Sequence, residues 1–227
     1  MLFVKPYQSS TKTAWDSFIY DAKNATFLFY RDYMEYHADR FDDYSLVIYD
    51  DTKIVGLFPA NRVGAVVYSH QGLSYGGLVT SSKTSLHTTG QLYITLLEFL
   101  KRNQITTVRL KLFPSFYASY ASNEATYLMF VLKAKKVKCD VTLAIDQGAI
   151  VGFNKNKKRN VIAAKNKSLI IAESSDFCLF WKDVLEPNLK ETHGIVPVHS
   201  YDEMGFLHRF YKDHIRLFTV FEENEIV

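Results

Sequence analysis

The sequence is poor in cysteine and has no long apolar run. Its two cysteines, Cys139 and Cys178, lie far apart and outside any Cys-x-x-Cys spacing. Neither a disulfide framework nor a zinc site is indicated, so we expect no metal and a reduced, cytoplasmic location. The first residues lack an apolar stretch of signal-peptide length, and the longest apolar runs, such as residues 127–132, are too short to span a membrane.

Positive charge is abundant in one part of the chain only. The 227 residues carry a formal net charge of +3, but residues 133–167 hold ten Lys and Arg against two Asp. Charge concentrated in this way is typical of an anion site or of a solvated face. We expect a small phosphate-bearing substrate. General nucleic-acid binding is not expected, because no aromatic residue interleaves with the charges of the basic helix at residues 154–167.

Two segments of the chain share one pattern. Residues 47–55 and 219–227 both read as strand, acidic tight turn and strand, 172 positions apart, and a helical stretch precedes each. A further helix, carrying Trp15 in the first copy and Trp181 in the second, comes before that stretch. Self-similarity at so long a period indicates two related domains. We expect the second copy to end at its first hairpin.

Hydrophobic periodicity predicts an α/β (α+β) layout with a mixed central sheet flanked by helices. The expected helices are residues 11–24, 29–41, 85–103, 154–167, 176–192 and 201–213. The expected strands are residues 45–49, 54–63, 65–69, 78–80, 106–112, 127–132, 141–144, 168–173 and 216–221. We place the domain boundary near residue 150, so that residues 151–227 form a basic linking helix and the N-terminal part of a second domain.

Three blocks of sequence carry a family resemblance. Residues 69–78 (SHQGLSYGGL), residues 156–162 (NKKRNVI) and residues 176–199 together resemble the tandem-GNAT proteins of the FemABX-like group, which include bacterial acetyltransferase-like proteins linked to polysaccharide synthesis. The resemblance implies a GNAT-like domain followed by the first half of a second one. It also implies transfer of an acyl group from acyl-coenzyme A, with acetyl-CoA a possible cosubstrate, to an amine of a sugar or cell-envelope precursor.

The coenzyme-binding turn of that family is altered in this chain. GNAT domains hold the pyrophosphate on a Gln/Arg-x-x-Gly-x-Gly/Ala turn at a helix N-terminus, where backbone N–H groups and the helix dipole meet the anion. The candidate turn runs from Gln71 to Gly76, with Ser74 in place of the first glycine. The sequence therefore contains no intact coenzyme-binding motif.

The candidate binding residues lie in two places. Gly76 and Gly77 either satisfy a turn that other residues cannot adopt or let a ligand approach the backbone. We expect an anion between this pair and the basic helix, opposite Lys157, Lys158 and Arg159. Arg159 should contribute most, because its guanidinium offers a bidentate fork to phosphate.

Of the two candidate catalytic residues, one precedes the turn and the other lies within it. His70 is nominated as a proton acceptor, and Tyr75 as a phenol that protonates a leaving thiolate. Each also has a structural interpretation, as an ordinary buried or surface side chain.

Two other functions stay open from the sequence. One is a non-catalytic GNAT-like binding module, which the altered turn favours. The other is FemABX-type aminoacyl transfer from aminoacyl-tRNA, which would need a broad basic face. We also expect possible self-association through the strand near residues 216–221, if that strand is left with an unpaired edge.

Overall fold

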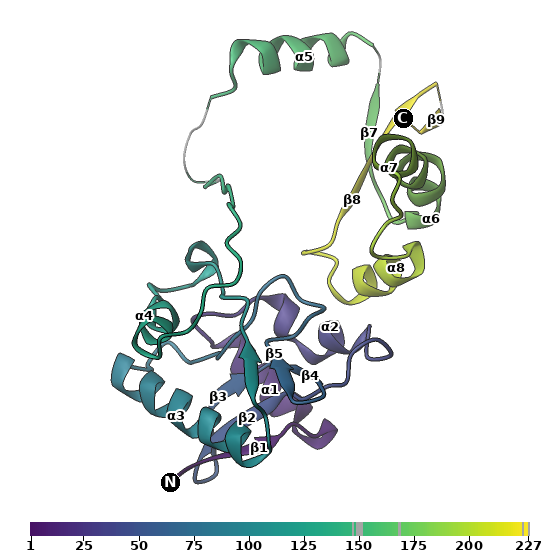
Figure 1. Cartoon of the computed structure of the whole chain (residues 1–227). Coiled ribbons are helices and arrows are strands. Elements are labelled where there is room, and N and C mark those ends of the chain that lie inside the picture. The colour runs from purple at the N-terminus through teal and green to yellow at the C-terminus, as the bar shows by residue number, and fades with distance from the viewer. Residues whose placement is uncertain (147, 149–151, 168, 224, 227) are drawn as a thin grey trace. The chain divides into compact units, whose positions relative to one another are not determined.

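The computed structural model describes residues 1–146, 148, 152–167, 169–223 and 225–226 and divides the chain into two compact units, Met1–Thr142 and Leu143–Val227 (Figure 1). The domain boundary expected near residue 150 stays a prediction, because residues 149–151 lie outside the described residues. The first unit contains β1 (Leu2–Pro6), η1 (Ser9–Thr11), α1 (Lys12–Tyr20), η2 (Phe27–Phe29), α2 (Arg31–Glu35), β2 (Leu46–Asp50), β3 (Lys53–Phe58), β4 (Asn61–Val63), β5 (Val66–Tyr68), α3 (Leu86–Arg102), β6 (Thr107–Arg109), η3 (Ser115–Tyr117) and α4 (Glu124–Val131). The second contains α5 (Lys155–Lys165), β7 (Ile170–Ser174), α6 (Phe177–Phe180), the π turn η4 (Trp181–Leu185), α7 (Glu186–His193), α8 (Tyr201–Phe210), β8 (Leu217–Glu222) and β9 (Glu225–Ile226).

The first unit has two three-stranded sheets. In one, β2 lies between β1 and β3 and is antiparallel to both. In the other, β5 lies between β4 and β6, antiparallel to β4 and parallel to β6. A parallel pair needs a crossover connection, and α3 lies in the connection between β5 and β6. The predicted mixed α/β class is confirmed.

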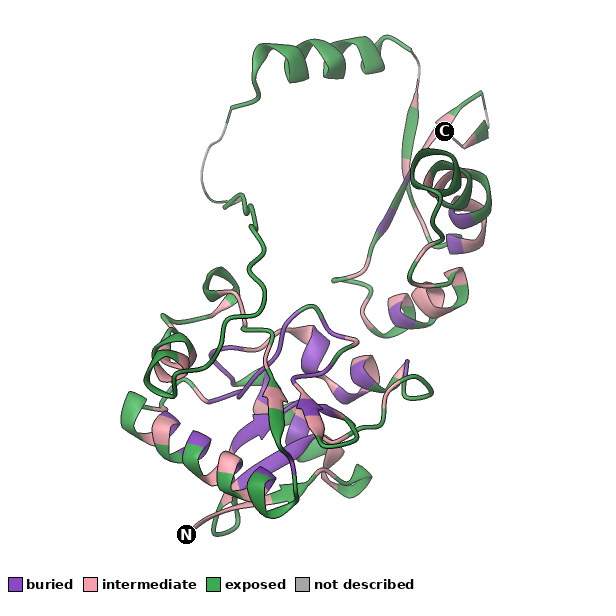
Figure 2. Ribbon diagram, in the orientation of Figure 1, coloured by how far each residue is buried: buried purple, intermediate pink, exposed green. Residues whose placement is uncertain are grey.

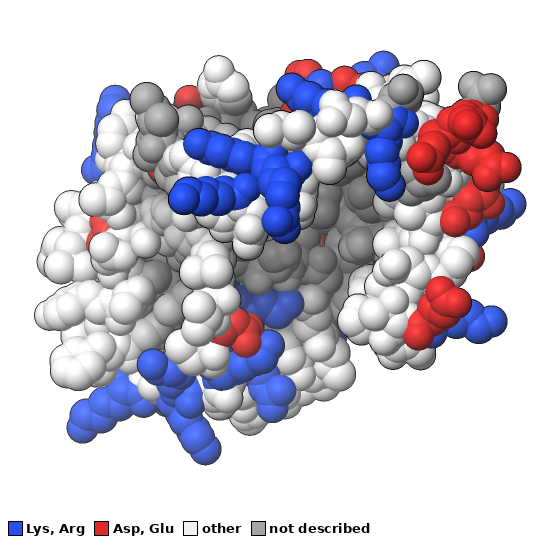
Figure 3. Space-filling view, turned by 90° about the horizontal axis from the view of Figure 1, so that it is seen from above, with Lys and Arg blue, Asp and Glu red and all other residues white. Residues whose placement is uncertain are grey.

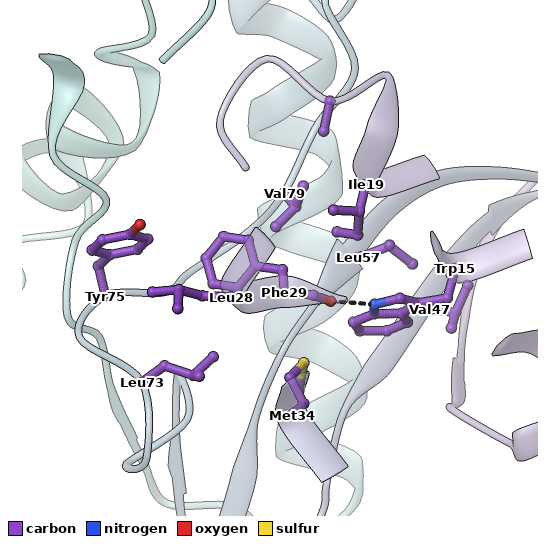
Figure 4. Close-up of a cluster of buried hydrophobic side chains, with 11 residues drawn as sticks. Trp15, Ile19, Leu28, Phe29, Met34, Val47, Leu57, Leu73, Tyr75 and Val79 are labelled. Atoms are coloured by element: carbon purple, nitrogen blue, oxygen red, sulfur yellow. Dashed lines mark hydrogen bonds between the residues drawn. The ribbon is translucent and has the colours of Figure 1, made fainter. Parts of the chain in front are cut away.

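The core of the first unit lies on both faces of β2. Val47 belongs to a cluster with Trp15 and Phe29, whereas Leu46 and Ile48 belong to a second cluster with side chains of α3. Because successive side chains of a strand point to opposite faces, α1 and α3 cover opposite faces of this sheet. Figure 2 shows the buried residues concentrated there, and Figure 4 shows the cluster around Trp15.

The second unit is built around one small sheet in which β8 lies between β7 and β9. Helices α6 and α7 are joined through η4, next to Pro187 in the first turn of α7. Proline has no N–H to give to the preceding turn, which accounts for the widened winding there. Helix α8 starts with a capping box in which Ser200 and Glu203 bond each other's backbone N–H groups at 3.2 and 2.9 Å.

The position of β8 changes the basis of the self-association prediction. This strand pairs with β7 from Leu217 to Phe221 and with β9 at Phe221 and Glu222, so it is a middle strand and not the free edge that we expected. Self-association stays a prediction, now without that support.

The two units repeat one order of elements. Each has a strand, a helix carrying a tryptophan, a second helix and a hairpin, and the first strand pairs with the hairpin's first strand. The hairpin registers agree at the 172-residue offset, since Tyr49 faces Ile54 in one and Phe221 faces Ile226 in the other. Asn224 and Val227, which belong to the expected second hairpin, lie outside the described residues.

Several predicted elements were wrong in type or extent. Residues 127–132, expected as a strand, lie mostly in helix α4, because a short apolar run does not by itself separate strand from buried helix. Residues 141–144 form no strand, and residues 78–80 contribute only a single bridge between Val79 and Leu57. The second helix is limited to Arg31–Glu35, and strand β1 was not predicted.

Candidate functional site

The turn at residues 70–77 lies between two contacts, one with the last residue of β6 and one with the chain just after β6. Ser69 N–H donates to the Arg109 carbonyl at 2.9 Å, and Gly76 N–H donates to the Lys111 carbonyl at 2.7 Å. A Cβ atom on Gly76 would lie 2.2 Å from the Ser69 carbonyl oxygen, so only glycine fits there. Gly77 has φ of +112° with open space beside it, which also favours glycine. Both glycines therefore have a structural reason to be present.

Hydrogen bonds to residues within the turn and to Asn61 and Lys111 outside it hold the turn closed. Gln71 N–H donates to Asn61 Oδ1 at 2.7 Å, and Leu73 N–H donates to the His70 carbonyl at 3.2 Å. Lys111 Nζ donates to the carbonyls of Gln71 and Leu73 at 3.0 and 2.7 Å. Three N–H groups that a pyrophosphate would use, those of Gln71, Leu73 and Gly76, already donate to protein oxygens. The turn is also separated from the N-terminus of α3, which begins at Leu86 with Ser85 as its cap.

Lys111 is a residue that the sequence analysis missed. Its side chain as a whole is exposed, but its amino group lies against the turn's carbonyls. Burial of that group lowers the pKa of Lys111, and the charge of Lys138 adds to the effect. No sequence signal marks this residue, because its partners lie about forty positions earlier in the chain.

His70 lies in a closed environment. It is 3% exposed with φ of +64°, and its ring lies 5.0 Å from the His37 ring and 5.6 Å from the Phe41 ring, centroid to centroid. Burial, and after it the neighbouring His37, lowers the pKa of His70 to about 3. Such a histidine is neutral at physiological pH but is a weak base. Its role as proton acceptor stays a prediction.

Tyr75 faces a different set of side chains. Its hydroxyl lies 2.7 Å from Thr26 Oγ1, and its ring packs edge-on against Phe29 and Phe113. Burial raises the pKa of Tyr75. Figure 4 shows it at the margin of the cluster that contains Phe29 and Trp15. Its role as a proton donor also stays a prediction.

A hollow lies beside the glycine pair, where Gly76 is next to Leu112. The bridge between Gly76 and Leu112 is parallel. The hollow measures about 350 Å³ including its open mouth, and its lining includes Asn24, Gly76, Gly77, Tyr93, Leu112 and Ser122. Asn24 fixes one wall, since its side chain donates to the Leu78 carbonyl at 2.8 Å and accepts from Thr80 N–H at 2.9 Å. Backbone groups and a few polar side chains thus meet at a shallow hollow, whose cavity volume without the open mouth is about 20 Å³, room for about one water molecule.

Helix α5 carries the basic residues expected of it. Asn154 caps the helix by accepting from Lys157 N–H at 2.9 Å. Every described residue of α5 is exposed, and among the described residues no acidic side chain forms an ion pair with Lys157, Lys158 or Arg159. Figure 2 shows the helix exposed along its length, and Figure 3 shows clusters of Lys and Arg side chains on the face that it draws.

The two halves of the expected anion site belong to different units. Gly76 and Gly77 lie in the first unit, and Lys157, Lys158 and Arg159 lie in the second. Their union in one site stays a prediction. Within the described ranges, no three His, Cys, Asp or Glu side chains gather as metal ligands would. No described helix is both long and apolar enough to cross a membrane.

Comparison with known proteins defines the class of fold. No family model matches the chain, and no curated protein matches it in sequence. The chain nevertheless has a FemABX-like fold. A crystal structure of FemX is similar to it with a TM-score of 0.54 at 12% sequence identity, over 96% of this chain and 57% of the FemX chain. The chain therefore spans less than two thirds of the length of that FemX.

Proposed function

We propose that this chain is part of a Fem-type acyltransferase, which moves an acyl group from a carrier to an amine. The observation that carries the proposal is the FemX-like fold over 96% of the chain. The hollow beside Gly76 and Gly77 supports it, because backbone groups that line the hollow next to a parallel bridge can orient an acyl carbonyl.

Between the two donors expected from the sequence, aminoacyl-tRNA fits better than acyl-coenzyme A. The N–H groups of Gln71, Leu73 and Gly76 are already bonded within the protein, so a pyrophosphate there would have to break those bonds. The exposed cations of α5 suit the phosphates of either donor, but aminoacyl-tRNA needs a basic face broader than this one helix.

The proposed reaction is direct attack of the amine on the ester carbonyl of the aminoacyl carrier. The amine nitrogen forms a bond to the carbonyl carbon, the carbon–oxygen bond to the ribose breaks, and the amine's proton passes to the leaving ribose oxygen. This chemistry depends mainly on holding the reactants in an oriented complex. We assign phosphate binding to Lys157, Lys158 and Arg159. Orientation of the acyl group is assigned to the backbone at Gly77, because the Gly76 N–H is already bonded within the protein.

The test measures donor binding and then transfer. Aminoacyl-tRNA, coenzyme A and a nucleotide sugar are titrated into the wild type, Arg159→Ala and, as a matched control, Lys101→Ala at the exposed end of α3. Loss of a charge-assisted hydrogen bond should weaken aminoacyl-tRNA binding roughly ten- to a hundredfold in Arg159→Ala and leave Lys101→Ala unchanged. Tighter binding of coenzyme A than of aminoacyl-tRNA would reverse the choice of donor. Equal binding by all three proteins would remove Arg159 from the site.

A non-catalytic binding module is the second candidate, and the closed turn at residues 71–76 favours it. The two candidates differ in turnover. Radiolabelled aminoacyl-tRNA and labelled acetyl-CoA are each incubated with the chain and a panel of amino sugars and peptide amines. Label transferred to an acceptor supports the acyltransferase. Tight binding of a donor without any transfer supports the binding module.

A further inference from the structure

Helix α4 presents an apolar face to solvent. Phe130 is 81% exposed, and Tyr127, Val131 and Leu132 are 54, 52 and 47% exposed. Residues 127, 130 and 131 are three and four positions apart, so they lie on one face of the helix. Figure 2 shows α4 largely in the colours of exposed and intermediate residues.

The exposed face of α4 does not contribute to the packing of the helix against the rest of the unit. The opposite face already contributes Ala125, Leu128 and Met129 to the cluster that contains α3. Only one apolar face of a helix is needed to pack it against its own core, so the second apolar face of α4 is left exposed to solvent. Large apolar side chains gathered on a surface mark an interaction site more often than isolated ones do.

A run of lysines begins where the apolar face ends. Ala134 N–H donates to the Met129 carbonyl at 2.9 Å and Lys133 N–H to the Phe130 carbonyl at 3.0 Å, a Schellman arrangement with Lys133 at φ of +52°. Lys135, Lys136 and Lys138 follow within five residues.

Nearby acidic groups do not cancel this charge. Glu124, the one acidic residue of α4, pairs with the buried Lys23 at 2.6 Å, and Asp140 pairs with Lys138 at 2.8 Å. Among the described residues no carboxylate forms an ion pair with Lys133, Lys135 or Lys136. The patch, defined as Tyr127, Phe130, Val131, Leu132, Lys133, Lys135 and Lys136, is therefore apolar on one side and cationic on the other.

We propose that this patch docks the chain on an anionic lipid surface. Aromatic and aliphatic side chains enter the boundary between headgroups and acyl chains, while lysines beside them are attracted to anionic headgroups. This inference is independent of the proposed acyl transfer, since it rests on α4 and the segment after it and not on the hollow or on α5.

Two other occupants fit the patch less well. Single-stranded RNA would use aromatic rings for stacking, but Val131 and Leu132 have no ring. A second copy packed around a twofold axis would bring the same lysines together, and their like charges would repel.

The experiment is co-sedimentation of the full chain with vesicles. Vesicles of phosphatidylcholine with phosphatidylglycerol are compared with vesicles of phosphatidylcholine alone. We expect binding to the anionic vesicles only, weakened by salt. Phe130→Ser should lower the partition coefficient roughly tenfold, and Lys135→Gln with Lys136→Gln should lower it roughly thirtyfold, about fivefold for each lysine.

Matched controls separate the patch from general surface properties. Tyr20 on α1 is 81% exposed, as Phe130 is, so Tyr20→Ser removes an equally exposed aromatic ring elsewhere in the same unit. Lys101→Gln with Arg102→Gln removes two exposed charges from the end of α3. Both controls should bind as the wild type does. Lys133→Gly should weaken binding without loss of stability, because glycine adopts a positive φ readily.

Other results would overturn the proposal. These are equal sedimentation with both kinds of vesicle, no sedimentation with either, or loss of binding in the controls as large as in the patch variants. Binding of single-stranded RNA that the patch variants abolish would assign the patch to RNA. A dimer in solution that Phe130→Ser dissociates would assign it to a second copy.

Discussion

The two units place a tryptophan in the same structural position but surround it differently. Trp15 Nε1 donates to the carbonyl of Phe29, two residues before α2, and Trp181 Nε1 donates to the carbonyl of His199, two residues before α8, both at 2.8 Å. In each unit the indole thus ties its helix to the start of the next one. Trp15 is fully buried in a large cluster, whereas Trp181 is 8% exposed in a cluster with two other buried side chains. The same hydrogen bond from a tryptophan to a backbone carbonyl therefore occurs in a large, deeply buried core and in a small one.

The largest expected effect comes from removing the two indoles. Trp15→Ala should destabilise the first unit by about 3–5 kcal/mol, the usual range for a buried Trp or Phe changed to Ala. Trp181→Ala should cost less, because fewer buried side chains surround it. Hydrogen exchange followed for each unit separately, alongside urea unfolding, measures both. Trp15→Phe keeps most of the apolar ring and should lose mainly the hydrogen bond, about 1 kcal/mol. Equal effects of the two Ala variants would contradict the comparison.

The second effect concerns the arginines that join elements in each unit. Arg31 is buried, lies 2.9 Å from Asp43 and 3.0 Å from Glu35, and stacks 3.8 Å from the Tyr7 ring. Removing its side chain leaves Asp43 without that partner, and Arg31→Ala should cost about 3 kcal/mol. Arg216 pairs with Glu173 at the surface, where solvent screens the charges. Arg216→Ala should therefore leave the urea midpoint unchanged, and a large shift there would show that the surface pair is more important than its exposure indicates.

How much of the difference between the two units could be predicted depends on how far apart in the sequence the interacting residues lie. The helices of the second unit, including the basic helix α5, and the hairpin of β2 and β3 follow from periodicity and from local turns. They lie close to the predicted residues, except that the helix expected at residues 176–192 is interrupted by η4. The bonds of Arg31 to Asp43 and Ser45 join residues that are 12 and 14 positions apart. The bonds by which Asn61 and Lys111 close the turn join residues that are 10 to 40 positions apart. Composition and spacing carry no signal for such contacts. The same holds for β1, which becomes a strand by pairing with β2 more than forty residues later.

In the candidate site too, some residues could be identified from the sequence, whereas their contacts could not. The glycines at positions 76 and 77 were identified from the sequence, but the reason for Gly76, its contact with Ser69, appears only in the folded chain. His70 and Tyr75 were nominated together, yet their rings pack against different clusters, because both lie in the loop between the contact of Ser69 with Arg109 and that of Gly76 with Lys111.

The third effect is a dependence on pH that should belong to the first unit. The folded state holds the pKa of His70 near 3, below the ordinary value of 6.5, so the unfolded chain binds a proton that the folded chain does not. Above pH 6.5 the histidine is neutral in both states and does not change the free energy of unfolding. As pH falls from 6.5 toward 3, proton binding stabilises the unfolded chain, so the first unit loses stability. Between pH 8 and pH 5 the loss should be about 2 kcal/mol. His70→Gln cannot titrate and should flatten the profile.

The smallest effect tests the matching hairpins. Asp51 and Glu223 occupy the same turn position at the 172-residue offset, and both have positive φ, +52° and +49°. A side chain in this left-handed conformation costs roughly 1 kcal/mol that glycine avoids, although glycine loses more backbone entropy on folding. Glu223→Gly should therefore stabilise the second unit by a few tenths to about 1 kcal/mol. Asp51→Gly should gain less, because aspartate tolerates this conformation better than glutamate and because Asp51 Oδ1 also accepts a hydrogen bond from the Met1 amino group at 2.7 Å. Thermal unfolding of the two variants, with Asp50→Ala as a control that removes only the other contact of Met1, gives the order. A larger gain from Asp51→Gly than from Glu223→Gly would show that the two turns, although alike in backbone, are held by different forces.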